Sequence, residues 1–372
     1  MSLLVEEIIK KYSLTPEQIE NITKTILKVL THEKESSDHP LAIIVGGQPG
    51  SGKTALISHT KQISSFRNFI AIDNDFFRSF HPKADEIKQQ YPSLFTQATD
   101  QLGMGITANV INYCLENKYD IILHQTLKNN RIGDDAIVSL KENGYTVGVR
   151  VFAVPFYESA ISQIERYLGQ AEKLGYCRFA TQEGHLKAYL GLPDTVDYLE
   201  KNGFYDFIQV FKRSEDISSP TCIYTSFNPN TKSQTLTTLY NCENAPTQNF
   251  KNGFRSAKDA VLKTRLSTAF ETKENISLRL SEAQGSIFNN TEIQSRIDEL
   301  KSSLDLIDKL ENIPAQIDTI KCLPEFTSTE GLPEYIKNFN THSNQLTPTI
   351  KIPRIEQNSI PEQTINCSQD NN

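Results

Sequence analysis

A phosphate-binding motif occupies residues 47–54, which match G-x-x-x-x-G-K-[ST] at every position. Its members are Gly47, Gln48, Pro49, Gly50, Ser51, Gly52, Lys53 and Thr54. Glycines let such a loop curl so that its N–H groups point at phosphate oxygens, and the following helix adds its positive end. In these loops the lysine reaches the β- and γ-phosphates and the Ser or Thr binds Mg²⁺. The motif therefore predicts an ATP and Mg²⁺ site, with a glycine-rich strand-to-helix turn as the alternative.

Two carboxylates, Asp73 and Asp75, follow the next short apolar run. Ligands of doubly wound sheets bind at the carboxyl ends of strands, and we expect this strand to neighbour the phosphate-loop strand. If the strand continued, its period of two would place both acids on one side. One could then serve as base for a substrate hydroxyl, and the other as a structural or metal partner. The alternative is turn chemistry at a strand end.

Two arginines, Arg166 and Arg178, lie about a dozen residues apart in the region that forms the lid of nucleotide kinases. Cationic side chains in a lid can hold the phosphates of a nucleotide. A helical arginine is also commonly a solvated surface residue. Spacing alone leaves these two interpretations equally open.

The elements that must position these side chains follow from the apolar pattern. Short apolar runs alternate with longer amphipathic stretches at residues 41–47, 68–73, 119–124, 145–154 and 205–212. This alternation predicts an α/β fold of the P-loop NTPase and nucleotide-kinase type, with a mainly parallel sheet flanked by helices. After about residue 215 the chain becomes rich in Ser, Thr, Asn and Pro, which indicates loops or weak strands.

Four segments are expected along the chain. They are an N-terminal helical segment (1–38), a kinase domain (39–230), an extension with helices (231–345) and a disordered tail (346–372). Thr15-Pro16-Glu17-Gln18 carries the signal of a helix start, with Thr as N-cap and Gln three residues later. In the extension, a short a/d seam begins at Ile293 and is expected to pack on its own chain or on a partner.

Composition excludes several classes of protein. The 372 residues carry a formal net charge of -7, which argues against a nucleic-acid binder that relies on a basic surface. No stretch approaches the roughly 18 apolar residues of a membrane helix, and no signal peptide is visible. Six cysteines without a close pair predict reduced thiols in a cytoplasmic protein. A secreted effector stays open.

In combination, these motifs resemble the zeta toxin family over about residues 40–230. They are "GGQPGSGKT", "IDNDFF" with "FHP" after it, a strand followed by Thr126, "AVP" before "IERY", and Arg178. The resemblance implies a P-loop kinase of a toxin–antitoxin system. Such kinases use ATP and Mg²⁺ to phosphorylate the 3′-hydroxyl of the sugar in UDP-N-acetylglucosamine, which starves cell-wall synthesis. It also implies a small helical antitoxin, like epsilon, that blocks the nucleotide site.

The resemblance also implies a role for each matching residue. Lys53 would be the phosphate-loop lysine and Thr54 the Mg²⁺ ligand. Asp75 would be the base that takes the proton of the sugar hydroxyl. Arg166 and Arg178 would hold the phosphates of ATP.

On the substrate side this chain departs from the family pattern. Thr126 matches the threonine of the family's E-G-T motif, but His124 stands where the glutamate would be. A second substrate-contacting glutamate would fall near Ala108. His81-Pro82 matches the family's His-Pro and is expected to shape the turn after the base.

Three hypotheses therefore remain. The first is an active kinase of UDP-N-acetylglucosamine or a similar nucleotide sugar. The second is a P-loop kinase with another acceptor, such as a nucleotide, a cofactor or an antibiotic. The third is a nucleotide-binding but catalytically impaired protein that acts by binding a partner.

Overall fold

The computed structural model describes residues 3–62, 68–91, 94–128, 137–174, 180, 182–214, 219–231, 253–271, 278–283, 294–295, 297–298 and 301. The helices are α1 (Leu3–Lys11), α2 (Pro16–Leu30), α3 (Lys53–Gln62), α4 (Asn74–Arg78), α5 (Ala84–Gln90), α6 (Phe95–Ala98), α7 (Asp100–Asn117), α9 (Phe156–Leu174), α10 (Gln182–Asn202) and α13 (Ala257–Glu271). The strands are β1 (Leu41–Gly46), β2 (Ile70–Ile72), β3 (Ile121–Gln125), β4 (Thr146–Phe152), β5 (Phe207–Lys212) and β6 (Thr221–Phe227). Residues 137–142 and 278–283 are also helical.

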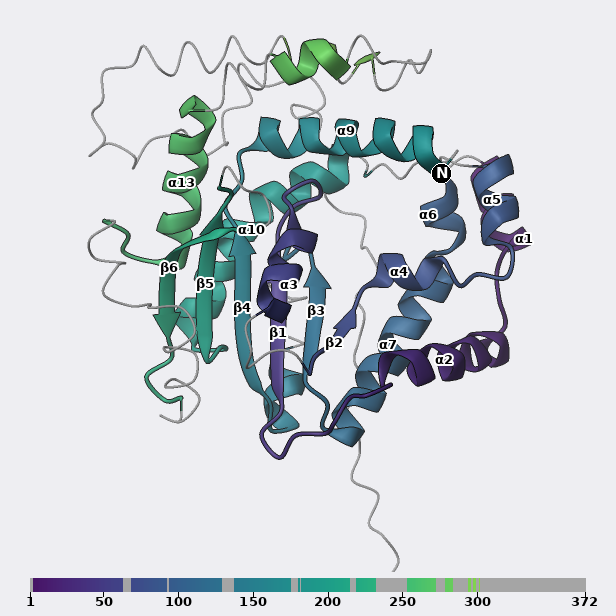
Figure 1. Ribbon diagram of the computed structural model, residues 1–372, viewed down its shortest axis with the longest axis horizontal. Helices are drawn as coiled ribbons and strands as arrows, with labels where there is room; N and C mark the ends of the chain where they lie inside the picture. The colour runs from purple at the N-terminus through teal and green to yellow at the C-terminus, as the bar shows by residue number, and fades with distance from the viewer. Residues whose placement is uncertain are drawn as a thin grey trace, which may run out of the picture.

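The strands form one mainly parallel sheet in the order β2-β3-β1-β4-β5-β6 (Figure 1). Strands β1 to β5 run parallel, and β6 pairs antiparallel with β5. Each of the five predicted apolar runs overlaps one of the parallel strands. The predicted α/β fold is therefore confirmed. The expected loops or weak strands after residue 215 include β6, which extends the sheet.

The predicted position of β2 is wrong. Strand β3 lies between β2 and the phosphate-loop strand β1, with Ile122 opposite both Ala71 and Ile43. Strand β3 has five residues and pairs on both sides, whereas β2 has three residues and pairs on one side only, as is common for an edge strand. The carboxyl ends of β1, β2 and β3 nevertheless meet at one edge of the sheet, because the three strands are parallel.

Helices cover both faces of the sheet (Figure 1). The larger hydrophobic cluster contains Ile106 and Val110 of α7 and Leu192 and Val196 of α10, packed against the sheet. On the other face, Leu56 of α3 packs on residues of β1, β3 and β5. Helix α9 crosses the upper end of the sheet in Figure 1, next to the loop between β1 and α3. Within the described ranges, no helix is long and apolar enough to cross a bilayer.

Helix α2 begins with the predicted capping box. Thr15 Oγ1 accepts a hydrogen bond from the Gln18 N–H (3.2 Å), and Gln18 Oε1 accepts one from the Thr15 N–H (2.8 Å). The helix then buries Ile19 and Ile26 in the larger cluster, against α7. The N-terminal helices are therefore packed on the rest of the fold.

Helix α1 is tied to the loop after α4 by His81, which is 4% exposed. His81 Nδ1 accepts a hydrogen bond from the Lys83 N–H (3.0 Å), and His81 Nε2 lies 2.9 Å from the carbonyl oxygen of Tyr12. Because Nδ1 accepts, Nε2 must carry the hydrogen and donate it to Tyr12. The expected role of His81 in shaping this turn thus extends to holding the end of α1.

This buried imidazole should make stability depend on pH. Burial lowers the pKa of His81, so the unfolded chain takes up a proton at a higher pH than the folded one. The stabilisation is fully present above about pH 6.5 and is lost as pH falls toward the lowered pKa. The free energy of unfolding, measured with urea at pH 7.5 and at pH 5.5, should therefore fall more between these two pH values for the wild type than for His81→Asn. Equal losses in both proteins would contradict this assignment.

Candidate functional site

The loop between β1 and α3 is curled tightly beneath α9. Gly50 (φ +79°) and Gly52 (φ +97°) take left-handed conformations that favour glycine. A Cβ atom at Gly50 would lie 2.0 Å from the carbonyl oxygen of Ser159 in α9. The loop can therefore approach α9 this closely only because position 50 has no side chain.

Lys53 opens α3 and folds back over the loop. Its Nζ donates hydrogen bonds to the carbonyl oxygens of Gly47 (2.7 Å) and Gln48 (3.1 Å). The next residue, Thr54, is exposed in the first turn of α3. The ammonium and the hydroxyl thus stand at the amino end of the helix, where its partial positive charge also lies.

Thr54 is the residue of the loop that could serve as a protein ligand for Mg²⁺. Among the described residues, no group of three or more His, Cys, Asp or Glu side chains could hold a metal ion. Mg²⁺ typically keeps several waters and takes one or two protein ligands together with phosphate oxygens. An exposed hydroxyl is a hard oxygen ligand of this kind, so Thr54 fits Mg²⁺ that arrives with a triphosphate.

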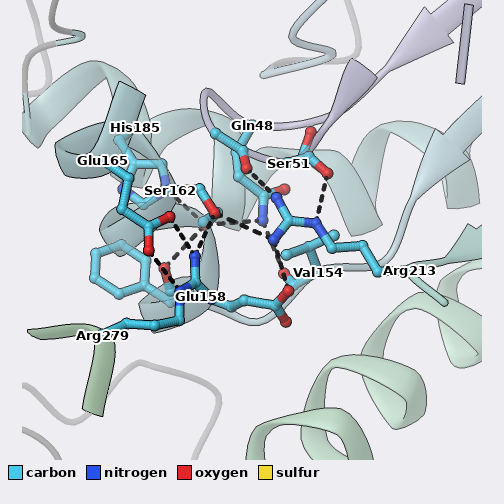
Figure 2. Close-up of polar contacts among 12 residues, drawn as sticks. Gln48, Ser51, Val154, Glu158, Ser162, Glu165, His185, Arg213 and Arg279 are labelled. Carbon is cyan, nitrogen blue, oxygen red and sulfur yellow. Dashed lines mark hydrogen bonds and ion pairs between the residues drawn. The ribbon is translucent and has the colours of Figure 1, made fainter. Parts of the chain in front are cut away.

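Arg213, directly after β5, binds the backbone of the loop (Figure 2). Its guanidinium donates to the carbonyl oxygens of Gly50 and Ser51 and pairs with Glu158 of α9 at 2.6 Å. These contacts hold the peptide groups of Gly50 and Ser51 in one orientation. Arg213 is not among the site residues predicted from the sequence. The available signal was a basic residue at the carboxyl end of a parallel strand.

The side chain of Gln48 anchors the loop from within and is fully buried. Its Nε2 donates to the Val154 carbonyl oxygen (2.8 Å) and to Ser159 Oγ (3.3 Å), and its Oε1 accepts from Arg265 Nη2 (3.2 Å). Ser159 Oγ also lies 2.8 Å from His185 Nε2. The second residue of the motif is therefore joined to the end of β4, to α9 and to α13.

Arg166 lies two helical turns after Ser159 on α9. Residues seven apart share a helix face, so Ser159 and Arg166 lie on the same face of α9. Gln163 of this face packs on the loop, because its Cγ lies 2.9 Å from the place of a Cβ atom at Gly50. Arg166 is therefore on the face of α9 that covers the phosphate loop. Arg178, its predicted companion, lies outside the described residues.

The two predicted acids occupy different structural positions. Strand β2 ends before Asp73, which is the N-cap of α4 and accepts a hydrogen bond from the Asp75 N–H at 2.9 Å. Turn chemistry thus holds for Asp73, and the continued strand that would place both acids on one side does not form. Asp75, in the first turn of α4, has a side chain 43% exposed, with Oδ1 3.5 Å from Arg78 Nε.

His124 contacts Asp73 across the ends of β3 and β2. Its Nδ1 lies 3.2 Å from Asp73 Oδ2, while its buried Nε2 has no hydrogen-bond partner in the described part of the chain. Asp73 thus links the two residues, because one of its carboxylate oxygens lies beside His124 and the other accepts a hydrogen bond from the backbone N–H of Asp75. Where the family pattern would place a glutamate, this chain has an imidazole beside a carboxylate from the next strand.

The turn after β3 has a strained conformation. Leu127 has a φ of +49°, which a leucine rarely adopts. Its side chain packs so closely on Gly46 that a Cβ there would lie 2.2 Å away, and its carbonyl oxygen accepts from Thr195 Oγ1 at 2.9 Å. Strain of this kind gathers at functional sites. The turn fixes the half-buried Thr126 beside the end of β1. Ala108, near the predicted place of the second family glutamate, is half-buried on α7.

A family model described as Zeta toxin matches residues 24–226 of this chain. The match includes the phosphate loop, Asp75, His124, Arg166 and Arg213. Helix α13 follows the matched segment. More than half of the chain is thus accounted for by one family.

Individual relatives agree with the family model. Toxin zeta of Streptococcus pyogenes is 29% identical over 200 residues, which cover 54% of this chain and 69% of the relative. Toxin PezT of Streptococcus pneumoniae serotype 4 is 29% identical over 205 residues, 54% of this chain and 77% of the relative. A structure from the PezAT chromosomal toxin–antitoxin system of S. pneumoniae aligns with a TM-score of 0.53 and 23% identity, over 73% of this chain and 99% of that one. The structural likeness concerns the fold.

Proposed function

The chain belongs to the zeta toxin family, and from this we propose that it is a toxin that uses ATP and Mg²⁺ to phosphorylate a sugar hydroxyl of UDP-N-acetylglucosamine or a similar nucleotide sugar. The supporting observation is that the phosphate loop and the acid pair Asp73 and Asp75 follow parallel strands that end at one edge of the sheet. A donor site and a base at the same edge meet the geometric need of phosphoryl transfer.

Cationic groups would stabilise the transferred phosphoryl group. The transition state of phosphoryl transfer is loose, with negative charge on the equatorial oxygens. Lys53 would exchange its loop carbonyl contacts for phosphate oxygens, and Arg166 and Arg178 would hold the triphosphate from the α9 side. Mg²⁺, bound to Thr54 and the phosphates, would neutralise charge on the β- and γ-phosphates.

Asp75 would act as the base. The hydroxyl proton moves to the Asp75 carboxylate as the hydroxyl oxygen bonds to the γ-phosphorus, and the bond from that phosphorus to the β-phosphate oxygen breaks to release ADP. The carboxylate is partly exposed, so an acceptor can reach it. The Asp73 cap fixes the backbone of Asp75 and hence the direction of its side chain.

The direct test is to incubate the full chain with ATP, Mg²⁺ and UDP-N-acetylglucosamine and to measure the mass of the nucleotide sugar. The proposal expects a gain of one phosphate. The second candidate function, a kinase with a different acceptor, is favoured by His124 and by Ala108 in place of the two family acids. A product found only with another nucleotide, cofactor or antibiotic would select it. ATP binding without product from any of these acceptors would select the impaired interaction protein.

The contact between His124 and Asp73 predicts a difference between two substitutions. In His124→Asn the amide nitrogen replaces Nδ1 and can still donate to Asp73, whereas in His124→Gln the amide stands nearer the place of Nε2. We expect the Asn variant to keep activity within a few-fold and the Gln variant to lose about ten-fold, as for other residues that orient reactive groups. Phosphate transfer assayed from pH 5 to 9 measures both. If the Gln variant is instead the more active of the two, Nε2 of His124 and not Nδ1 is the atom that matters for activity.

A small helical antitoxin is the partner that we propose. The similar structure comes from a chromosomal toxin–antitoxin system. Co-expression with a short reading frame beside the gene should restore growth of cells that the kinase arrests. The described cysteines, Cys114 and Cys222, are free thiols, which suits a cytoplasmic site of action.

A further inference from the structure

We propose that α13, although it lies beyond the segment matched by the family model, completes the nucleotide site, and that Arg265 is a positioning residue for the phosphate loop. The proposal rests on the proposed function only in taking this loop as the site of a nucleoside triphosphate. It gives a role to a part of the chain for which the sequence motifs suggested none.

Helix α13 is an integral part of the fold. Ala257, Ala260 and Val261 are fully buried in the larger hydrophobic cluster, and the helix contacts α10, β5 and β6 (Figure 1). The Ala257 N–H at its start donates to Glu200 of α10 at 2.8 Å. The helix is thereby held in a fixed position, from which one of its side chains reaches the nucleotide loop.

Arg265 makes that contact from a buried position, with 4% of its surface exposed. Its Nη1 donates to the carbonyl oxygen of Tyr189 (2.8 Å), and its guanidinium carbon lies 4.0 Å from the centre of the Tyr189 ring. Its Nη2 donates to Gln48 Oε1 at 3.2 Å. Burial lowers the pKa of Arg265 to about 10, so the group stays charged at neutral pH. The arginine is fixed by α10 and directed at the loop.

The effect on the loop follows from the needs of Gln48. Both ends of its amide are buried, and the Arg265 bond complements the two bonds that Nε2 donates to Val154 and Ser159. Removing the Arg265 donor leaves Oε1 buried and short of a hydrogen bond, which favours loop conformations that expose it. Gln48 precedes the turn at Gly50, so a change in its side chain passes directly to the N–H groups that face a phosphate.

A second contact from the same region acts on α9. Arg279 binds both carboxylate oxygens of Glu165 at 2.6 Å and donates to Ser162 Oγ at 3.2 Å (Figure 2). Ser162 Oγ also accepts from Arg213, which binds the backbone of the loop. The extension thus fixes α9 at the residue before Arg166, the predicted phosphate ligand.

The test compares Arg265→Met with Lys258→Met, a change on the same helix. Lys258 pairs with Asp194 of α10 at 2.8 Å and is partly exposed. Hydrogen exchange of the backbone amides of residues 47, 48 and 50–53 is measured in the ligand-free full chain, since Pro49 has no N–H, and the Kd for ATP is measured separately. Arg265→Met should speed exchange of these amides and weaken ATP binding about ten-fold, while Lys258→Met should leave both unchanged. If Arg265→Met does not fold, Arg265→Lys is measured in its place.

A double-mutant cycle with Gln48→Ala assigns the effect to the contact. Arg265→Met should add nothing to Gln48→Ala if the arginine acts through Gln48. Additive effects would overturn the proposal, as would wild-type exchange in the Arg265 variant. The exchange measurement needs neither ATP nor acceptor. If the protein forms no phosphorylated product, the proposed function is contradicted. The exchange experiment on the Arg265 variants still tests the role of Arg265 in that case.

Discussion

Replacing Lys53 with methionine should lower the rate of phosphate transfer about a thousand-fold, because the variant lacks a cation that the proposed mechanism places on the transferred phosphoryl group. Methionine keeps most of the apolar stem, and the variant loses the hydrogen bonds that the ammonium donates to the carbonyl oxygens of Gly47 and Gln48 at the partly exposed loop. The fold should therefore persist. The rate is measured as phosphate mass gained by the acceptor, and the fold by the thermal unfolding midpoint.

Lys24→Met is the matched control for loss of a charge. Lys24 pairs with Glu20 on the exposed face of α2, away from the nucleotide loop. This variant should transfer phosphate at the wild-type rate. If Lys53→Met transfers phosphate at the wild-type rate, the proposed role of the phosphate loop in the reaction is wrong.

Replacing Asp75 with asparagine should lower kcat by a factor of about a hundred to ten thousand, because the amide cannot accept the hydroxyl proton. The side chain keeps its size, and the backbone N–H of residue 75 keeps its bond to Asp73. The Kd for ATP should therefore stay within about two-fold of the wild type, well under the tenfold step that 1.4 kcal/mol brings. The measurements are product formation at saturating ATP and the Kd for ATP.

Asp73→Asn is the control for this pair of acids. Asparagine is as good an N-cap as aspartate, so α4 should begin at the same residue. The variant loses the charge beside His124 but keeps the cap, and it should retain far more activity than Asp75→Asn. If Asp75→Asn instead turns over at the wild-type rate, another group must take the proton.

Local signals in the sequence predicted local structure well. The capping box of α2 and the tight turn between β1 and α3 depend on residues within a few positions of one another, and both are present in the structure. Strand order does not depend on neighbours in sequence. The strand beside β1 is β3, which pairs with it from a distant part of the sequence, so the apolar runs alone could not place β2.

The polar groups that hold the loop show the same limit. Arg213 and Arg265 are single arginines without a surrounding motif, and their partners stand 163 and 217 positions earlier in the sequence. Their role arises only when β5 and α13 reach the loop in the folded chain. His124 and Asp73 were both candidates from the sequence, but their direct contact required knowing that β3 and β2 are adjacent.

The distance in sequence between Gln48 and Arg265 has a consequence during protein synthesis. A ribosome that adds about 5 to 20 residues per second needs roughly 10 to 40 s to pass from one of these codons to the other. A growing chain can fold its N-terminal helices and first strands in that time. During that time Arg265 has not been synthesised, so Gln48 Oε1 lacks the hydrogen bond that this arginine donates. If Arg265 positions the loop as proposed, nascent chains and chains cut short before α13 would lack this contact, and the complete nucleotide site would form only after translation of the C-terminal part.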